Sequence, residues 1–422
     1  MDQLYKFFKE TSGICTDTRN IEKDSFFVAL KGANFNGNKF ALNALEKGAK
    51  YAIVDESEYA NDSRIFLVNN GLVFLQNLAK YHRAQFNIPI IGITGSNGKT
   101  STKELIATVL TQKFNTLSTK GNLNNHIGVP LTLLQMNKEH ELAIIEMGAN
   151  QHGDIAELCE IASPTHGIIT NIGKAHLEGF GDLKGVVETK RALYTAVQSV
   201  NGTIFYNEDD DLLKSLLSST TENISYGKQS AAIQGDLVEL NPFIKMSWKS
   251  SRYTSEILQT NMIGSYNFYN FLAAICIGYH LGVPHNLISQ AVSNYQSKNN
   301  RSQVMNTERN TLIIDCYNAN PTSMLSALES FKEFKHKNKI AILGDMMELG
   351  EDSHLEHQKI QAVCHDYGIK TILVGSIFKA MNDLTGFENV EDLIGNLPKL
   401  NGSAILLKGS RSIQLEKLIS YL

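Results

Sequence analysis

The segment whose residues most clearly point to a chemical function is a glycine-rich loop, Gly92 to Ser101, which reads GITGSNGKTS. It follows an apolar run that begins at Ile90 and precedes a stretch with helical apolar spacing, so it is predicted to join a buried strand to a helix. Glycines let backbone amides surround a phosphate, while Lys99 can reach the outer phosphates and the Thr100 hydroxyl can bind Mg²⁺. The usual loop has glycine where this chain has Ile93, yet the pattern still predicts a nucleoside triphosphate site. It does not specify the reaction.

An acidic residue ends the next buried run. Glu146 follows the apolar residues 143–145. A carboxylate at the end of a buried strand beside a phosphate loop can hold Mg²⁺. A GTPase would also carry an N-K-x-D motif for the base, and the nearest string, Asn137 to His140, lacks the Asp. The pattern therefore gives no support for a guanine nucleotide.

A lysine lies in an unexpected place on the predicted helix over residues 183–197. At about 100° per residue, six apolar residues fall within roughly 60° of Lys190: Leu183, Val186, Val187, Leu193, Tyr194 and Val197. One interpretation is a rim lysine whose stem is buried and whose ammonium reaches water. The other is a functional amine, since burial favours neutral lysine, which is nucleophilic and can react with CO₂ to form a metal-binding carbamate. Periodicity leaves both open.

The elements that position these residues follow an α/β pattern. Short apolar runs typical of strands buried on both faces start near residues 90, 143, 167, 203, 312, 340, 371 and 404. Segments with helical periodicity lie between many of them, which predicts mainly parallel sheets. A helical stretch covers 72–86, and the polar stretch 297–302 is typical of a link. We therefore predict three domains, at residues 1–86, 87–298 and 299–422.

Composition narrows the class of protein. The chain has 422 residues and a formal net charge of −4, which argues against an electrostatic nucleic-acid binder. Five scattered cysteines predict free thiols in a reducing compartment. Charges interrupt the N-terminus too early for a signal-peptide core, and the longest apolar stretch, 271–278, is too short to span a bilayer. We expect a cytoplasmic monomer that does not insert into membranes.

Several further strings occur in a fixed order along the chain. They are Thr16–Arg19, Gly121–Pro130 (GNLNNHIGVP), Ile145–Ala149 (IEMGA), Ala175–Gly181 (AHLEGFG), Asp315–Pro321 (DCYNANP), Gly344–Gly350 and Lys408–Ser412 (KGSRS). Together with the phosphate loop, this set resembles the Mur ligases of peptidoglycan synthesis over essentially the whole chain. Within that family it resembles the MurF type, which adds D-alanyl-D-alanine to UDP-N-acetylmuramoyl-tripeptide.

The resemblance implies an N-terminal UDP-binding domain, a central P-loop ATPase-like domain and a C-terminal Rossmann-like domain. It implies that ATP phosphorylates the terminal carboxylate of the tripeptide and that the dipeptide amine attacks the acyl phosphate, giving the muramoyl-pentapeptide precursor of the cell wall. It also implies Mg²⁺ and an N6-carboxylated Lys190.

The resemblance assigns roles to individual residues. Lys99, Lys190 and His176 would be catalytic. The phosphates would be held by Gly95, Ser96, Asn97, Gly98, Lys99, Thr100 and Ser101. Thr100 and Glu146 would bind one Mg²⁺, and His176 with carboxylated Lys190 a second. Asn267 and Asn270 would lie at the adenine, Arg301 at the γ-phosphate, and Asp315 at the ribose or in domain orientation. UDP-substrate contacts would include Asp17, Thr18, Arg19, Asn122, Asn124 and Asn125, and dipeptide contacts Asn318, Asn320, Lys408 and Ser410.

Two departures and three alternatives stay open. The family often has His where this chain has Tyr266, and Asp-Gly-His where it has Asn36-Gly37-Asn38, so the adenine and uridine contacts are in question.

A MurE-type ligase would carry an Asp-Asn-Pro-Arg motif, which this sequence lacks, and a folylpolyglutamate synthetase would not be expected to show the Gly121–Pro130 string. A nucleotide-switch protein is disfavoured by the missing N-K-x-D motif and by Lys190. The third residue of the tripeptide, diaminopimelate or lysine, is undetermined.

Overall fold

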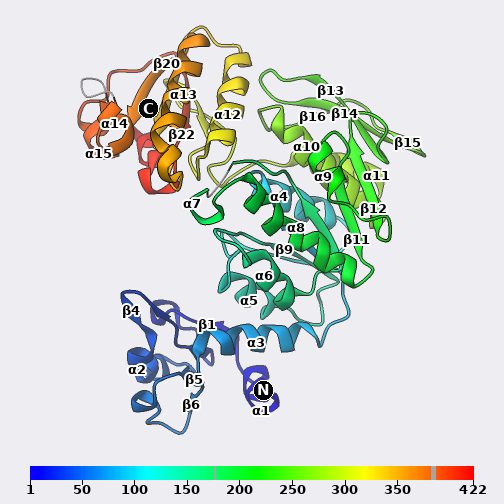
Figure 1. Ribbon diagram of the computed structural model, residues 1–422, viewed down its shortest axis with the longest axis vertical. Helices are drawn as coiled ribbons and strands as arrows, with labels where there is room; N and C mark the ends of the chain where they lie inside the picture. Colours follow the sequence, from blue (N-terminus) through cyan, green and yellow to red (C-terminus); the bar gives the residue numbers. More distant parts are fainter. Residues whose placement is uncertain (175–176, 382–385) are drawn as a thin grey trace.

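The computed structural model describes residues 1–174, 177–381 and 386–422. Three bodies follow one another along the chain, each built around its own sheet (Figure 1). Within these ranges, no helix combines the length and the apolar character needed to cross a membrane. The predicted α/β class is confirmed.

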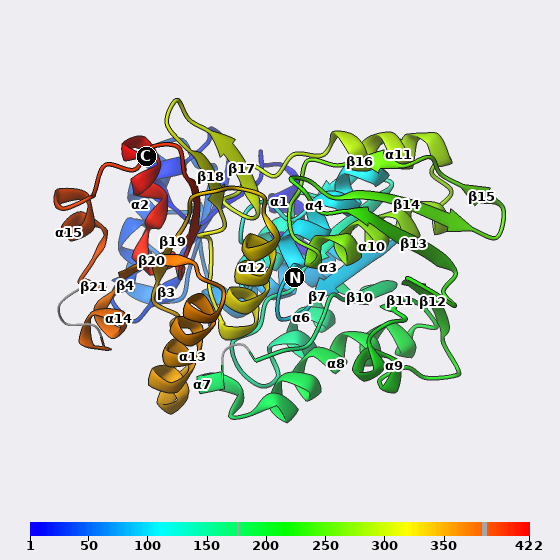
Figure 2. The same cartoon turned by 90° about the horizontal axis from the view of Figure 1, so that it is seen from above.

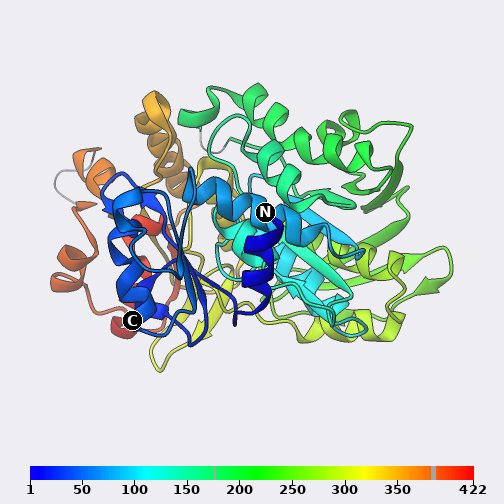
Figure 3. The same ribbon diagram turned by 90° about the horizontal axis from the view of Figure 1, so that it is seen from below.

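The N-terminal body is a small parallel sheet covered by helices on both faces. Its strands lie in the order β1 (Ile14–Cys15), β2 (Phe26–Val28), β5 (Tyr51–Val54) and β6 (Ile65–Leu67), beside the hairpin β3 (Lys31–Gly32) and β4 (Phe35–Asn36). The helices are α1 (Asp2–Lys9), α2 (Ala41–Glu46) and α3 (Gly71–Arg83). Helix α3 also packs on the central body, as Figures 1 and 3 show. There the His82 ring nitrogens pair with the Tyr5 hydroxyl and the Met136 carbonyl.

The central body holds a ten-stranded sheet. Its strands are β7 (Ile90–Thr94), β8 (Thr116–Ser118), β9 (Leu142–Glu146), β10 (His166–Ile169), β11 (Thr203–Asn207), β12 (Glu222–Gly227), β13 (Ile233–Glu239), β14 (Lys245–Ser250), β15 (Tyr253–Thr254) and β16 (Leu258–Gln259). The order is β15-β14-β13-β12-β11-β10-β7-β9-β8, with β16 beside β14. Strands from β8 to β13 run parallel, whereas β14 is antiparallel to its neighbours.

Helices cover both faces of this sheet, as Figure 2 shows. One face carries α4 (Lys99–Leu110), α10 (Tyr266–His280) and α11 (His285–Asn294); the other carries α5 (Gly128–Leu133), α6 (Asp154–Ala162), α8 (Leu183–Ser199) and α9 (Asp211–Ser215), with the short α7 (Leu177–Phe180) before α8. Side chains alternate between the two cores: Ile91 and Ile93 face α4 and α10, whereas Ile90 faces the opposite core. This double burial explains the continuous apolar runs in the sequence.

The C-terminal body is a second helix-covered sheet in the order β17-β18-β22-β19-β20-β21. The strands are β17 (Gln303–Asn306), β18 (Thr311–Ile314), β19 (Lys339–Gly344), β20 (Lys370–Val374), β21 (Gly386–Phe387) and β22 (Ala404–Lys408), and only β17 is antiparallel to its neighbour. Its helices include α12 (Pro321–Glu333), α13 (Ser353–Asp366), α14 (Ser376–Met381) and α15 (Val390–Gly395).

The sequence predicts the parallel strands better than the antiparallel ones. All eight predicted runs form strands, and the helical stretch at 72–86 forms α3. The antiparallel extension β13–β16 was not predicted. Its burial alternates along β14, with Met246 and Trp248 buried and Lys249 exposed, so it lacks the continuous apolar run that marks the eight predicted strands.

Candidate functional site

The predicted phosphate loop joins β7 to α4. Gly98 has a positive φ of 78°, and a Cβ there would lie 3.0 Å from Asn270 Oδ1. A Cβ on Gly95 would collide with Thr170 Oγ1. Both positions therefore require glycine, because the loop is pressed between β10 and α10. The strand–loop–helix context predicted from the sequence is confirmed.

Two residues set the shape of this loop. The Lys99 ammonium donates to the carbonyls of Gly95 (2.7 Å) and Ser96 (3.3 Å), so it lies across the loop. The Asn97 backbone donates to Asn171 Oδ1 (3.0 Å) and accepts from Thr170 Oγ1 (2.6 Å). Burial lowers the pKa of Lys99, Glu146 opposes this shift and Arg301 adds to it.

Glu146 ends β9 beneath the first turn of α4. Its Oε1 accepts from Thr100 Oγ1 (3.0 Å) and from Asn124 Nδ2 (2.8 Å), whereas its Oε2 is buried with no hydrogen-bond partner. A buried carboxylate oxygen left open beside a hydroxyl is a hard-oxygen donor set that suits Mg²⁺. The residues present thus fit the predicted metal.

Lys103, for which the sequence predicted no role, lies beside the same carboxylate. Its Nζ donates to the Thr119 carbonyl (2.7 Å) and lies 4.0 Å from Glu146 Oε2. The Thr119 hydroxyl in turn accepts from the Glu146 backbone N–H (3.0 Å). Lys103 stands one helical turn beyond Lys99, so i, i+4 spacing on a helix entering a phosphate site was an available signal.

Lys190 is buried, so of the two interpretations that periodicity leaves open, the structure does not support the rim lysine whose ammonium reaches water. The Asp182 side chain caps α8 by accepting from Gly185 N (2.9 Å), and the helix presents Lys190 inward with 2% of the residue exposed. Its Nζ lies 6.0 Å from the centroid of the Phe180 ring. Burial, with a smaller contribution from the Lys99 charge, lowers the pKa of Lys190 well below its usual value. The predicted partner His176 lies outside the described residues.

Three polar residues behind the loop form a buried chain. Thr102 Oγ1 donates to Asn270 Oδ1 (3.0 Å), Asn270 Nδ2 to Asn267 Oδ1 (2.8 Å), and Asn267 Nδ2 to the Ile263 carbonyl (2.8 Å). Asn270 thus ties α10 to α4, and Asn267 ties Asn270 to the Ile263 carbonyl. Their contact with adenine stays a prediction.

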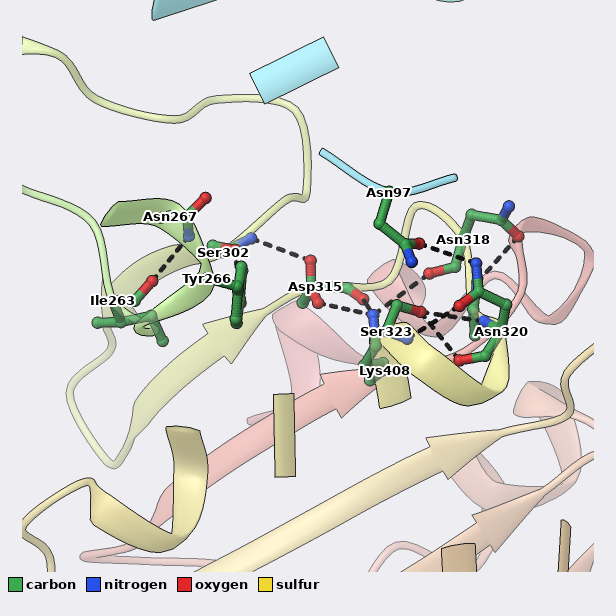
Figure 4. A network of polar contacts seen from close by, with 11 residues as sticks. Asn97, Ile263, Tyr266, Asn267, Ser302, Asp315, Asn318, Asn320, Ser323 and Lys408 are labelled. Atoms are coloured by element: carbon green, nitrogen blue, oxygen red, sulfur yellow. Dashed lines mark hydrogen bonds and ion pairs between the residues drawn. The ribbon is translucent and has the colours of Figure 1, made fainter. Parts of the chain in front are cut away.

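Tyr266, the departure from the family pattern, anchors the interdomain link. Its hydroxyl pairs with Ser302 Oγ (2.8 Å), and the Ser302 backbone N–H donates to Asp315 Oδ1 (3.1 Å; Figure 4). At the end of the same link, the Arg301 guanidinium stacks on the Tyr317 ring at 3.6 Å, and its buried Nε has no hydrogen-bond partner. Tyr317 lies within the motif Asp315–Pro321, and the sequence predicted no role for it.

The residues predicted to contact the dipeptide lie at the carboxyl edge of the C-terminal sheet. Lys408 is 2% exposed and forms an ion pair with Asp315 Oδ2 (2.7 Å). Ser410 Oγ accepts from Met347 N (3.0 Å), and Asn318 Oδ1 accepts from Ala319 N (2.9 Å). These polar groups are already used within the domain, so their contact with a substrate stays a prediction.

Asn320 reaches across to the central body. Its Nδ2 donates to Asn97 Oδ1 of the phosphate loop (2.8 Å; Figure 4). The contact brings the first turn of α12 onto the loop that joins β7 to α4. It joins two motifs that are more than two hundred residues apart.

The remaining predicted substrate residues lie on two separate surfaces. Asp17 caps the short helix at Thr18–Asn20 and pairs with Arg19 (2.7 Å), which lowers the pKa of Asp17 to about 2. These residues belong to the N-terminal body. In the loop before α5, Asn124 contacts Glu146, and the Asn122 carbonyl accepts from Asn124 N. Asn125 Oδ1 accepts from Gly128 N (2.9 Å) where α5 begins.

The arrangement gathers cations around one metal-compatible carboxylate. The charges of Arg301 and Glu146 shift the pKa values of both Lys99 and Lys103, and Lys99 lowers that of Lys190. Such a cluster would repel itself without an anion. It suits a triphosphate whose charge must be neutralised while a second anion approaches.

Family models cover nearly the whole chain. The Mur ligase family catalytic domain matches residues 10–92, the Mur ligase middle domain 93–278, and the Mur ligase glutamate ligase domain 300–411. A protein of Buchnera aphidicola subsp. Baizongia pistaciae is 35% identical over 97% of this chain and 92% of its own length, and one of Bacillus subtilis is 31% identical over 96% and 92%. Both are named UDP-N-acetylmuramoyl-tripeptide–D-alanyl-D-alanine ligase.

Solved structures agree with this over the full length. MurF from Acinetobacter baumannii superposes with a TM-score of 0.88 at 28% identity, covering 100% of this chain and 98% of that one. MurF from Thermotoga maritima, solved in complex with ADP, gives 0.82 at 25% identity, covering 97% and 96%.

Proposed function

The chain belongs to the Mur ligase family, and from that premise we propose that it joins D-alanyl-D-alanine to UDP-N-acetylmuramoyl-tripeptide with hydrolysis of ATP. The product is the muramoyl-pentapeptide precursor of peptidoglycan. The two relatives named UDP-N-acetylmuramoyl-tripeptide–D-alanyl-D-alanine ligase are matched over 92% of their own length, and one superposed MurF structure contains ADP. The predicted enzyme class and ATP use agree with these comparisons.

One observation carries the ATP chemistry: the Lys99 amine spans the phosphate loop directly beside the Thr100–Glu146 pair. In the proposed reaction the carboxylate of the tripeptide attacks the γ-phosphorus and displaces ADP. The dipeptide amine then attacks the carbonyl carbon of the acyl phosphate, loses a proton and expels phosphate. Lys99 and Arg301 would neutralise charge on the transferring phosphoryl group, where both substrates are anionic. Thr100 and Glu146 would hold Mg²⁺, which supplies further neutralisation.

Lys190 is proposed to be carboxylated on its amine. Burial favours the neutral amine that CO₂ requires, and the resulting carbamate would turn that amine into a metal-binding anion. The surroundings of the Lys190 amine support this role. The amine is buried near the Phe180 ring and lies close enough to Lys99 for their charges to interact. The second metal ligand proposed from sequence, His176, is untested.

The three bodies are proposed to bring one substrate each. The N-terminal body would bind the UDP portion, the central body ATP, and the C-terminal body the dipeptide. All five cysteines are free thiols, and four of them are buried, which fits a reducing compartment. We therefore place the reaction in the cytoplasm, with the monomeric state as a further prediction.

The purified chain tests this function directly. Phosphate release and pentapeptide formation are followed by mass spectrometry with ATP, Mg²⁺, UDP-muramoyl-tripeptide and D-alanyl-D-alanine. We expect both products only when every substrate is present. Ligation of diaminopimelate or glutamate in place of the dipeptide would transfer the chain to another branch of the family. Phosphate release that ignores the muramoyl substrate would refute the ligase assignment.

A further inference from the structure

Asn320 makes three hydrogen bonds at the start of α12, two through its side chain and one through its backbone N–H. Its Oδ1 accepts from Ser323 N (2.9 Å), its backbone N–H donates to Ser323 Oγ (3.0 Å), and its Nδ2 donates to Asn97 Oδ1 (2.8 Å). The first two form a capping box, which holds the side chain in one orientation. The third bond therefore depends on the position of the whole helix relative to the phosphate loop.

Asn97 is equally constrained on the central body. It lies between Gly95 and Gly98, and its backbone is bonded to Thr170 and Asn171 at the end of β10. A displacement of Asn97 would consequently displace the loop amides that are proposed to bind a phosphate. The Asn97–Asn320 contact thus joins a capped helix end to a loop whose backbone is held by Thr170 and Asn171.

A second contact joins the same helix end to the same loop. Ser96 Oγ donates to the Gly173 carbonyl and accepts from Gly173 N, both at 2.9 Å. Gly173 in turn lies under α12, since a Cβ there would be 3.1 Å from Thr322 Oγ1. The first turn of α12 therefore rests on a platform made of Ser96–Asn97 and 171–173.

We propose that Asn97 and Asn320 are positioning residues through which the nucleotide-bound loop holds the C-terminal domain over the acyl phosphate. This rests on the proposed function and extends it to the choice between two nucleophiles. With the domain held, the dipeptide nitrogen attacks the carbonyl carbon, loses a proton and expels phosphate to form the amide. With the domain loosened, water attacks the same carbon, phosphate leaves and the carboxylate is regenerated, so ATP is consumed without ligation.

Variants can separate this contact from helix capping. Asn320→Ser retains a capping hydroxyl but is too short to reach Asn97, and Asn97→Ala removes the acceptor. Because each variant replaces one hydrogen bond within the protein by hydrogen bonds to water, we expect each to raise the KM for D-alanyl-D-alanine roughly 2- to 12-fold. Each should also raise the ratio of phosphate released to amide formed above one. The double variant should show no larger effect on KM and on the ratio than the more impaired of the two single variants. Gln76→Ala, which removes a contact between the N-terminal and central bodies, should keep the ratio at one. Additive losses, or an unchanged ratio in Asn320→Ser, would overturn the proposal.

A readout without turnover tests the contact independently of the ligase function. We expect a non-hydrolysable ATP analogue to slow amide hydrogen exchange across residues 318–326 in the parent chain. The slowing should disappear in Asn97→Ala, although the analogue still binds, as shown by protection of α4. Equal slowing in both proteins would refute the coupling. Failure of ligation with intact coupling would count against the proposed function alone.

Discussion

The guanidinium carbon of Arg301 lies 3.6 Å from the centroid of the Tyr317 ring, and Arg411 approaches the same ring at 5.8 Å. Arg301 ends the polar link between domains, whereas Tyr317 follows β18 of the C-terminal sheet. The ring therefore holds a cation from the link where its charge acts on Lys99 and Lys103. Tyr317 connects the C-terminal sheet to the charge balance of the phosphate site.

The first prediction concerns this stacked pair. Tyr317→Leu removes the ring under Arg301 and should lower kcat/KM for ATP roughly 2- to 30-fold, the range set by a cation–π contact of about 0.5–2 kcal/mol. Tyr317→Phe keeps the ring and should stay near the parent value. Steady-state kinetics with ATP as the varied substrate measure both. Equal losses in the two variants would assign the effect to the hydroxyl instead.

The second prediction concerns Glu146, whose Oε2 is buried without a hydrogen-bond partner. Glu146→Gln preserves the shape of the side chain but removes the charge that would hold Mg²⁺. The Mg²⁺ concentration for half-maximal rate should rise by roughly tenfold or more, since even outer-shell changes at metal sites cost about that much. Thr108→Ala serves as the control, because Thr108 lies about two turns beyond Thr100 on α4. An unchanged Mg²⁺ titration in Glu146→Gln would remove this residue from the metal site.

The third prediction concerns Lys190. Lys190→Ala should abolish ligation, and small carboxylates such as formate should partly restore it, because they can replace the carbamate as an anionic ligand. Native mass spectrometry in bicarbonate should show one added CO₂ on the parent chain and none on the variant. Lys184→Ala, on the exposed side of the same helix, should behave like the parent. Restoration by an added amine would indicate a cationic role and contradict the carbamate.

The fourth prediction concerns stability against pH. Burial, together with the charge of His280, lowers the pKa of His166 from 6.5 to about 4. The unfolded chain therefore binds a proton that the folded chain rejects between these values, so stability falls as pH drops from about 6.5 towards 4 and is insensitive to this group above 6.5. The largest slope from this residue is ~1.4 kcal/mol per pH unit.

Chemical denaturation at several pH values measures this effect. His166→Gln cannot take up the proton and should show a shallower loss of unfolding free energy between pH 6.5 and 4. The parent and variant slopes should converge above pH 7. An identical acid slope in the two proteins would show that His166 is not the group responsible.

Much of the site could be predicted from local spacing. The loop from Gly92 to Ser101 was placed between a strand and a helix because apolar periodicity changes from a continuous run to a helical repeat across it. Lys190 was placed on a buried face by the same reasoning, and it is buried. Leu183 was placed on the same stripe but is 43% exposed, because it is the first residue of α8 and lies beyond the core that covers the later turns.

The fold class, the strand–loop–helix at the phosphate loop and the place of Lys190 on an apolar stripe can be inferred from the sequence, since each depends on residues close together in the chain. The partners of those residues are visible only in the folded protein. Folding turns Lys408 inward to Asp315, places Tyr317 under Arg301 and brings Asn320 to Asn97. The physical reason is that the period of a helix or strand constrains which way a side chain faces within its own element. The packing of sheets and links that are far apart in sequence sets which side chain it meets.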